Sequence, residues 1–141
     1  MPQHGVMDFW SVAQWVLRIA LALAFLFMGV SHFVPKVART MAAMIPPALY
    51  VNGRISREGI LSPINLVRFT GLCEIAGAIG ILVPFTRFAA GVCLVLFLIA
   101  VFPANAHAAA NPERFGRAAF PFWPRYFAQL ALIVAVMLAV L

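Results

Sequence analysis

The sequence predicts an all-α integral membrane protein: a four-helix bundle with an interfacial amphipathic helix in its first loop. The chain of 141 residues is 65% hydrophobic and 10% charged, and its mean hydropathy of +1.01 lies outside the range of soluble domains. Four apolar stretches match the roughly 20 residues that a helix needs to cross a bilayer. Little polar sequence separates them, so residues 1–141 are expected to form a single transmembrane domain.

The four predicted spans cover about residues 10–34, 66–83, 88–109 and 122–141. Each is predominantly apolar, as a helix in lipid must be. In the third span, Pro103 removes a backbone hydrogen bond, which predicts a kink or an opening there. The spans are expected to pack as neighbours in one bundle.

The second span is suited to close helix packing. Cys73 and Gly77, and likewise Ala76 and Gly80, are small residues four positions apart. Such pairs let helix backbones approach each other in lipid. The two cysteines of the chain, Cys73 and Cys93, form no C-x-x-C motif, so we interpret them as packing residues.

The first loop contains the amphipathic helix. In residues 36–45 the apolar Met41, Met44 and Ile45 recur at helical spacing, and Pro46 follows. This helix either caps the mouth of the bundle or rests on lipid.

The net charge of +6 reflects membrane topology, since no soluble aromatic-rich domain is present to bind nucleic acid. The positive-inside rule places the first and third loops in the cytoplasm and both termini in the periplasm. The basic residues of these two loops are Lys36, Arg39, Arg54, Arg57, Arg114 and Arg117.

Charged residues within the spans mark the candidate site, because a charge in hydrocarbon normally faces the bundle interior and finds a partner. Arg18 and His32 share one stripe of the first span, about 21 Å apart along its axis. Glu74 lies near the middle of the second span, and its height predicts an ion pair with Arg18. Such a pair either serves chemistry or only fixes helix register. An unpaired Glu74 would instead stay protonated and exchange a proton.

Two further polar residues complete the predicted site. Asn105 is expected to point into the bundle, and Gln129 shares a face with Arg125 and can reach the same cavity. His32 and His107 lie near the same boundary, which permits bis-histidine haem ligation, but we favour polar capping. No metal site is predicted.

Several motifs occur in a fixed order: Gly29-Val-Ser-His-Phe-Val-Pro35, Met44-Ile-Pro-Pro47, Gly71-Leu-Cys-Glu-Ile-Ala-Gly-Ala-Ile-Gly80 continuing to Arg87, and Phe102-Pro-Ala-Asn105. Over about residues 18–129 they resemble the DoxX family of small four-helix membrane proteins. The family takes its name from a membrane subunit of thiosulfate:quinone oxidoreductase. The resemblance implies the bacterial inner membrane, quinone as cofactor and a redox partner subunit.

The expected function is therefore that of a membrane subunit of a quinone-linked redox system. Glu74 and Arg18 are its candidate catalytic residues, and His32, Asn105 and Gln129 are the candidate quinone-binding residues. One alternative is a binder or isomerase of a lipophilic small molecule. Another is a structural or assembly subunit without catalysis. Membrane lipid and a second copy of the chain complete the expected partners.

Overall fold

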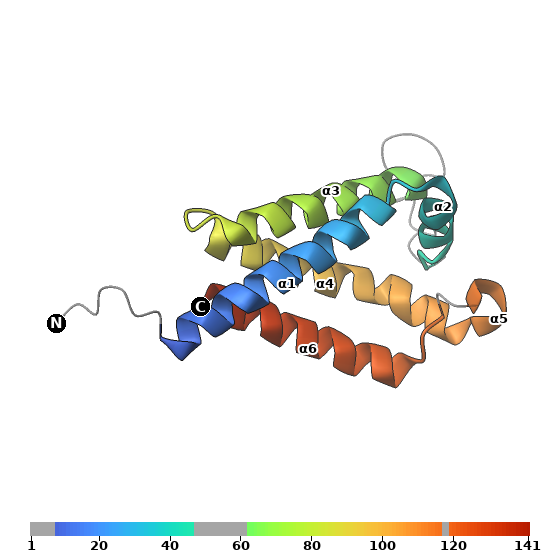
Figure 1. The fold of residues 1–141 in the computed structure, drawn as a ribbon. Helices are drawn as coiled ribbons and strands as arrows, with labels where there is room; N and C mark the ends of the chain where they lie inside the picture. The colour runs from blue at the N-terminus through green and yellow to red at the C-terminus, as the bar shows by residue number, and fades with distance from the viewer. Residues whose placement is uncertain (1–7, 47–61, 117–118) are drawn as a thin grey trace.

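The computed structural model describes residues 8–46, 62–116 and 119–141, and within these ranges the chain forms helices and no strands. Four of the helices are long and apolar enough to cross a membrane, so the predicted all-α fold is confirmed (Figure 1). Two shorter helices lie at one end of the bundle. In chain order the helices are α1 (Phe9–Ser31), α2 (Pro35–Ala43), α3 (Pro63–Leu82), α4 (Arg87–Ala110), α5 (Pro112–Phe115) and α6 (Phe122–Val140).

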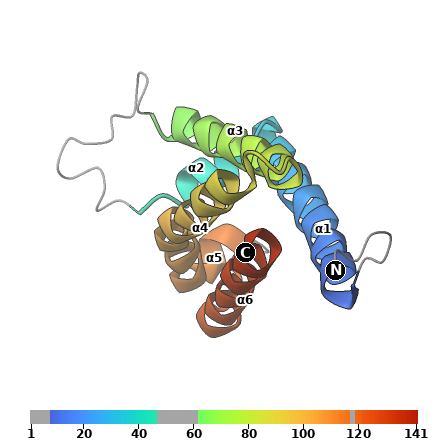
Figure 2. The same ribbon diagram turned by 90° about the vertical axis from the view of Figure 1, so that its left-hand side faces the viewer.

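The four spans pack in a ring. α1 packs against α3, α3 against α4, and α4 against α6, and α1 and α6 close the ring (Figure 2). α1 and α6 converge at the end of the bundle where the C-terminus lies, and they diverge toward the other end (Figure 1). The closing contact is therefore made mainly at one end. Large apolar side chains remain exposed along all four spans, as expected of a surface that faces lipid.

Two helix ends differ from the sequence prediction for local reasons. α1 ends at Ser31 rather than at residue 34, because Val34 precedes Pro35 and adopts an extended conformation (φ −76°, ψ 119°). α3 begins at Pro63 rather than at residue 66. Ser62 caps it by accepting a hydrogen bond from the Asn65 amide at 3.4 Å.

Of the two outcomes predicted at Pro103, the opening does not occur, since α4 is one continuous helix through this residue, and the kink stays a prediction. In the third loop the short helix α5 was not predicted. It begins at Pro112 and ends before Gly116, whose φ of +53° suits a residue without a Cβ atom.

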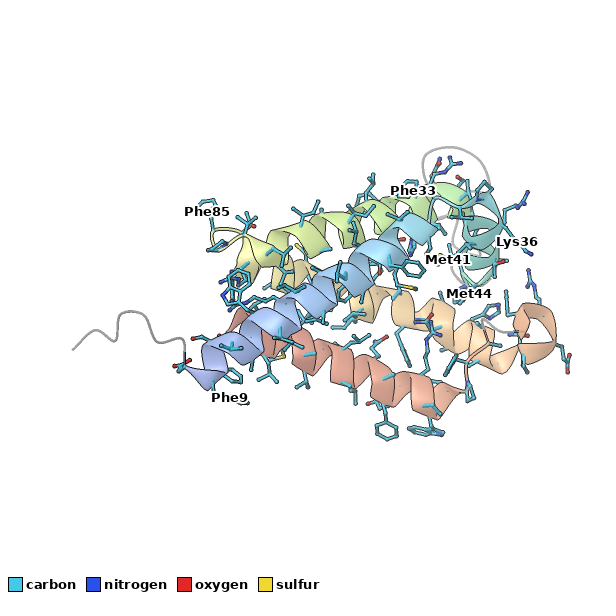
Figure 3. All side chains as sticks on the ribbon, in the orientation of Figure 1. Phe9, Phe33, Lys36, Met41, Met44 and Phe85 are labelled. Atoms are coloured by element: carbon cyan, nitrogen blue, oxygen red, sulfur yellow. The ribbon has the colours of Figure 1, made fainter. Side chains whose placement is uncertain are left out.

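α2 is the helix that was predicted in the first loop, and it covers the end of the bundle. Ala38 is 3% exposed, and Met44 packs with Ala108 and Phe115. Lys36 is exposed and points away from the bundle (Figure 3). The apolar side of α2 therefore contacts protein, which favours the capping role over a helix that only rests on lipid. Arg54 and Arg57 of the same loop, and Arg117, lie outside the described residues.

Glycines set the closest approaches between helices. A Cβ atom at Gly71 would lie 2.6 Å from Cβ of His32 and 2.9 Å from the carbonyl oxygen of Gly29. A Cβ atom at Gly29 would lie 3.0 Å from the carbonyl oxygen of Gly71. α1 and α3 thus cross almost backbone to backbone at these two glycines. On the same helix α3, Gly77 and Gly80 instead make room for Leu94 and Ala90 of α4.

We predict that Gly71→Ala destabilises the bundle by about 1–3 kcal/mol, the usual cost of overpacking, because the added methyl group meets atoms that cannot move aside. The thermal unfolding transition of the detergent-solubilised protein measures this loss. Ala76→Val is the matched control, since Ala76 is on the exposed side of the same helix. Equal unfolding temperatures for the two variants would contradict the backbone-to-backbone crossing.

Candidate functional site: a buried histidine–glutamate pair

His32 and Glu74 meet beside the glycine crossing of α1 and α3. Nε2 of His32 lies 2.9 Å from Oε2 of Glu74, and the two residues are 7% and 4% exposed. Each of the two residues lies three positions after the glycine at which α1 and α3 cross, as Gly29-x-x-His32 and Gly71-x-x-Glu74. The glycines bring the backbones together, and the two polar side chains fill the space one turn away.

The other ring nitrogen of His32 fixes the tautomer. Nδ1 lies 2.9 Å from the carbonyl oxygen of Val67 and 3.1 Å from Oγ1 of Thr70, which itself donates to the same carbonyl at 2.8 Å. Because a carbonyl oxygen only accepts, Nδ1 must carry a hydrogen and donate it. Nε2 then faces Glu74 either as a lone pair or as N–H⁺.

One proton is shared between His32 and Glu74 in either arrangement. If Nε2 is unprotonated, the carboxylic acid of Glu74 provides the proton, and if Nε2 is protonated, the carboxylate receives it. Both arrangements have zero net charge, which suits a site away from water. Oε2 of Glu74 is sealed from solvent, and it faces Nε2 of His32 at 2.9 Å.

His32 directly follows the last residue of α1. Thr70 is half-buried and lies on the Nδ1 side of the ring. Glu74, His32 and Thr70 thus form a continuous path for a proton from the buried carboxyl group toward a less buried hydroxyl group.

The predicted Arg18–Glu74 ion pair is wrong. Nε of Arg18 donates to the carbonyl oxygen of Ala139 at 2.7 Å, and Glu74 pairs with His32 instead. Arg18 precedes His32 by 14 residues on α1, so the two levels are about 21 Å apart. The prediction failed because it assumed that the cytoplasmic ends of α1 and α3 lie at the same depth in the membrane. Their actual relative height is set by the crossing of Gly29 and Gly71.

Arg18 therefore caps the C-terminal end of α6. The last carbonyl groups of a helix have no partner within that helix, and in lipid no water replaces one. Arg18 and Gln14 on α1 donate to the carbonyl oxygens of Ala139 and Leu138 in the last turn of α6, at 2.7 and 3.0 Å. The cation also lies at the negative end of the α6 dipole.

Arg87 serves the end of α3 in the same way. Its Nε donates to the carbonyl oxygen of Ile81 at 3.1 Å, and its guanidinium lies 5.1 Å from the ring centre of Trp15. The guanidinium of Arg18 lies 5.0 Å from the same ring. Sequence reasoning missed this arrangement, although the position of Arg87 directly after the turn that ends α3 was a usable signal.

The other predicted site residues lie elsewhere. Oδ1 of Asn105 accepts from Nη2 of Arg125 at 2.7 Å, which joins α4 to α6. Gly77 of α3 packs on Leu94 of α4, so these two residues lie at the same level of the bundle. At a rise of about 1.5 Å per residue along the two antiparallel helices, Asn105 then lies about 12 Å from the level of Glu74. Gln129 is half-buried and makes no hydrogen bond with any residue that the structure describes. The structure therefore contains separate polar sites rather than one shared chamber.

His107 stacks edge-on against Phe115 with ring centres 5.7 Å apart, and its Nε2 is buried without a partner among the described residues. Both ring nitrogens of His32 already face other groups. Haem ligation by these two histidines would require His32 to leave the pair. The described part of the chain contains no group of three or more His, Cys, Asp or Glu side chains that could hold a metal ion.

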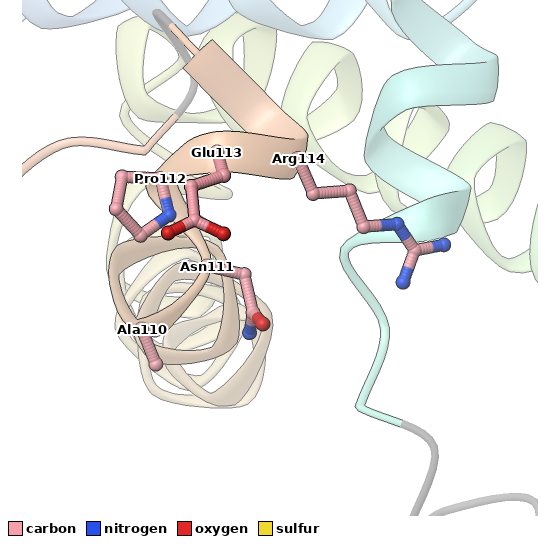
Figure 4. A pocket seen from close by; sticks show the side chains of 5 residues that line it. All are labelled: Ala110, Asn111, Pro112, Glu113 and Arg114. Carbon is pink, nitrogen blue, oxygen red and sulfur yellow. The ribbon is translucent and has the colours of Figure 1, made fainter.

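Two open hollows in the surface lie away from the pair. One, of about 280 Å³, is at the end of α4 and is lined by residues 110–114 (Figure 4). The other, of about 110 Å³, is an apolar groove between α1 and α3. Neither His32 nor Glu74 lines either of them.

These features define a multi-pass α-helical membrane protein with a buried histidine–glutamate pair between two tightly crossed spans. The chain belongs to the family described as a domain of unknown function, DUF8561, whose sequence model matches residues 21–140. Comparisons with curated proteins and with solved structures found no match.

Arg18→Leu should destabilise the last turn of α6 by about 1–3 kcal/mol, because it leaves the Ala139 carbonyl without its donor. Hydrogen exchange in this turn and the unfolding temperature measure the loss. Arg68→Leu, which removes an exposed arginine from α3, is the control. If the two variants lost equal stability, the capping role of Arg18 would be refuted.

Proposed function

We propose that this protein is the membrane subunit of a quinone-linked redox system, and that Glu74, His32 and Thr70 exchange a proton with the quinone head group. The observation that carries the proposal is the buried 2.9 Å contact between the imidazole of His32 and the carboxyl group of Glu74. The proposal places the protein in a bacterial inner membrane with both termini periplasmic. The resemblance to the DoxX family supports the quinone.

A quinone accepts two electrons and two protons as it becomes a quinol. The electrons would come from a redox partner subunit, since the chain has no C-x-x-C motif. The residues of the chain would supply protons. His32 donates from one ring nitrogen while the other is reprotonated, so a proton moves through the ring. Transfer of the proton between Nε2 and Oε2 leaves the pair neutral. Donation to the quinone would leave a carboxylate at Glu74, and a proton that enters through Thr70 and the His32 ring would restore neutrality.

The sequence also predicted roles in the quinone site for Arg18, Asn105 and Gln129. Since Arg18 holds the end of α6 and Asn105 binds Arg125, these residues are proposed to shape the bundle rather than to contact the quinone. His32, Glu74 and Thr70 remain as the group that can exchange a proton.

A structural subunit is the second candidate, and the packing at Gly29 and Gly71 favours it. In a structural subunit, the His32–Glu74 contact would only fix the position of α1 along the axis of α3. A shift of either helix would leave the buried Glu74 without a partner, which is costly. A binder or isomerase of another lipophilic molecule would use the same pair as general acid and base.

Organic extracts of the purified protein distinguish these candidates. Mass spectrometry should find quinone with the wild type and about tenfold less with Glu74→Gln, as loss of a charged hydrogen-bond acceptor implies. Glu113→Gln, at an exposed acid on α5, should retain the quinone. Thr70→Val keeps the size of the side chain and should retain quinone while slowing proton-coupled reduction in membranes.

Equal quinone in all variants would refute the redox proposal. A different lipophilic molecule, lost with Glu74→Gln, would support the binder or isomerase. If Glu74→Gln lowers the unfolding temperature but no molecule co-purifies with any variant, the structural role remains.

A further inference from the structure

Two positive charges share one aromatic ring at the end of the bundle opposite His32. The guanidinium carbons of Arg18 and Arg87 lie 5.0 and 5.1 Å from the ring centre of Trp15. Arg18 is only 7% exposed and Arg87 is half-buried. Trp15 attracts both cations through its ring face, which holds the two guanidinium groups near each other.

No acidic side chain among the described residues neutralises these charges. Asp8 caps the start of α1, ten residues from Arg18 and thus about 15 Å along the helix. Glu74 pairs with His32, and Glu113 lies on α5 at the far end of the bundle. Two like charges in a half-buried site repel each other, and a bound anion would relieve that repulsion.

Donor groups remain free to bind such an anion. Arg18 uses Nε for the Ala139 carbonyl, and its two Nη atoms donate to no residue that the structure describes. Neither of these Nη atoms is sealed inside the protein. Arg87 likewise uses Nε on Ile81, and its Nη2 makes only a long bond of 3.5 Å to Leu82. Arginine donors of this kind bind phosphate oxygens well.

An apolar groove between α1 and α3 begins beside these arginines. Ile19, which follows Arg18, and Leu82, whose carbonyl Arg87 contacts, are at its end. Ala22 and Ala78, 6% and 2% exposed, form the floor, and larger side chains form the walls. A groove of about 110 Å³ suits part of one acyl chain. Its full lining is Ile19, Ala22, Leu23, Leu26, Ala78, Ile79 and Leu82.

We propose that this end of the bundle binds an anionic phospholipid, with its phosphate on Arg18 and Arg87 and one acyl chain in the groove between α1 and α3. The two arginines match the charged phosphate of such a lipid, and the apolar groove matches its acyl chain. Inorganic phosphate could satisfy the arginines but would leave the groove unused. The site is about 21 Å along α1 from His32, so it is independent of the proposed redox function.

Thermal unfolding of delipidated protein in detergent tests the proposal. Phosphatidylglycerol should raise the unfolding temperature of the wild type in a saturable manner, because a ligand that binds only the folded state stabilises it. Phosphatidylcholine, inorganic phosphate and diacylglycerol should each raise it much less. The apparent affinity for phosphatidylglycerol should be about tenfold weaker in Arg87→Gln, as loss of one charge-assisted contact implies.

Arg68→Gln is the matched control, because it removes one arginine charge from the same helix pair at the other end of α3 and should leave the affinity unchanged. Ile79→Trp fills the groove from its lipid-exposed wall and should weaken binding while both arginines stay in place. Equal stabilisation by phosphatidylcholine or by inorganic phosphate would overturn the proposal. So would equal affinities in Arg87→Gln and Arg68→Gln, or full affinity in Ile79→Trp.

Discussion

The structure depends on one constraint: inside a bilayer, each backbone polar group needs a partner within the protein. Helix interiors meet this need automatically, but helix ends do not. Here Arg87 and Arg18 donate to the last turns of α3 and α6. These contacts tie neighbouring helices together at one end of the bundle. Arginine suits this task, because its several donors can serve a carbonyl group, stack on Trp15 and still bind another group.

The close crossing of α1 and α3 creates the only acid–histidine contact seen among the described residues. Without side chains at Gly29 and Gly71, the two backbones approach, and His32 lies directly against Gly71. This position delivers the imidazole to Glu74 and to the Val67 carbonyl at the same time. Packing and polar chemistry thus depend on the same two glycines. Any change that separates the helices would also expose a buried carboxyl group.

The sequence predicted the spans well and the site only in part. Apolar stretches of membrane length identify four helices, because no other structure buries so much apolar sequence in lipid. The sequence also indicated that His32 and Glu74 face the interior of the bundle, since buried charges need partners. It did not predict that these two side chains contact each other. A sequence gives the position of a residue along its own helix but not the relative height of two helices, which here follows from side-chain contacts at Gly71. The Ser62-Pro63 start of α3 was readable and overlooked.

The separation of the polar groups has a physical consequence for function. A carboxylate paired with arginine would stay charged and would hold its neighbours firmly, so it would be a poor proton carrier. Histidine differs, because its ring changes protonation state within the physiological pH range. By assigning Arg18 to a backbone carbonyl and His32 to Glu74, the fold keeps the cations Arg18 and Arg87 away from the carboxyl group of Glu74. This separation suits the proton exchange that we propose, because no arginine among the described residues pairs with Glu74 and holds it in its charged form.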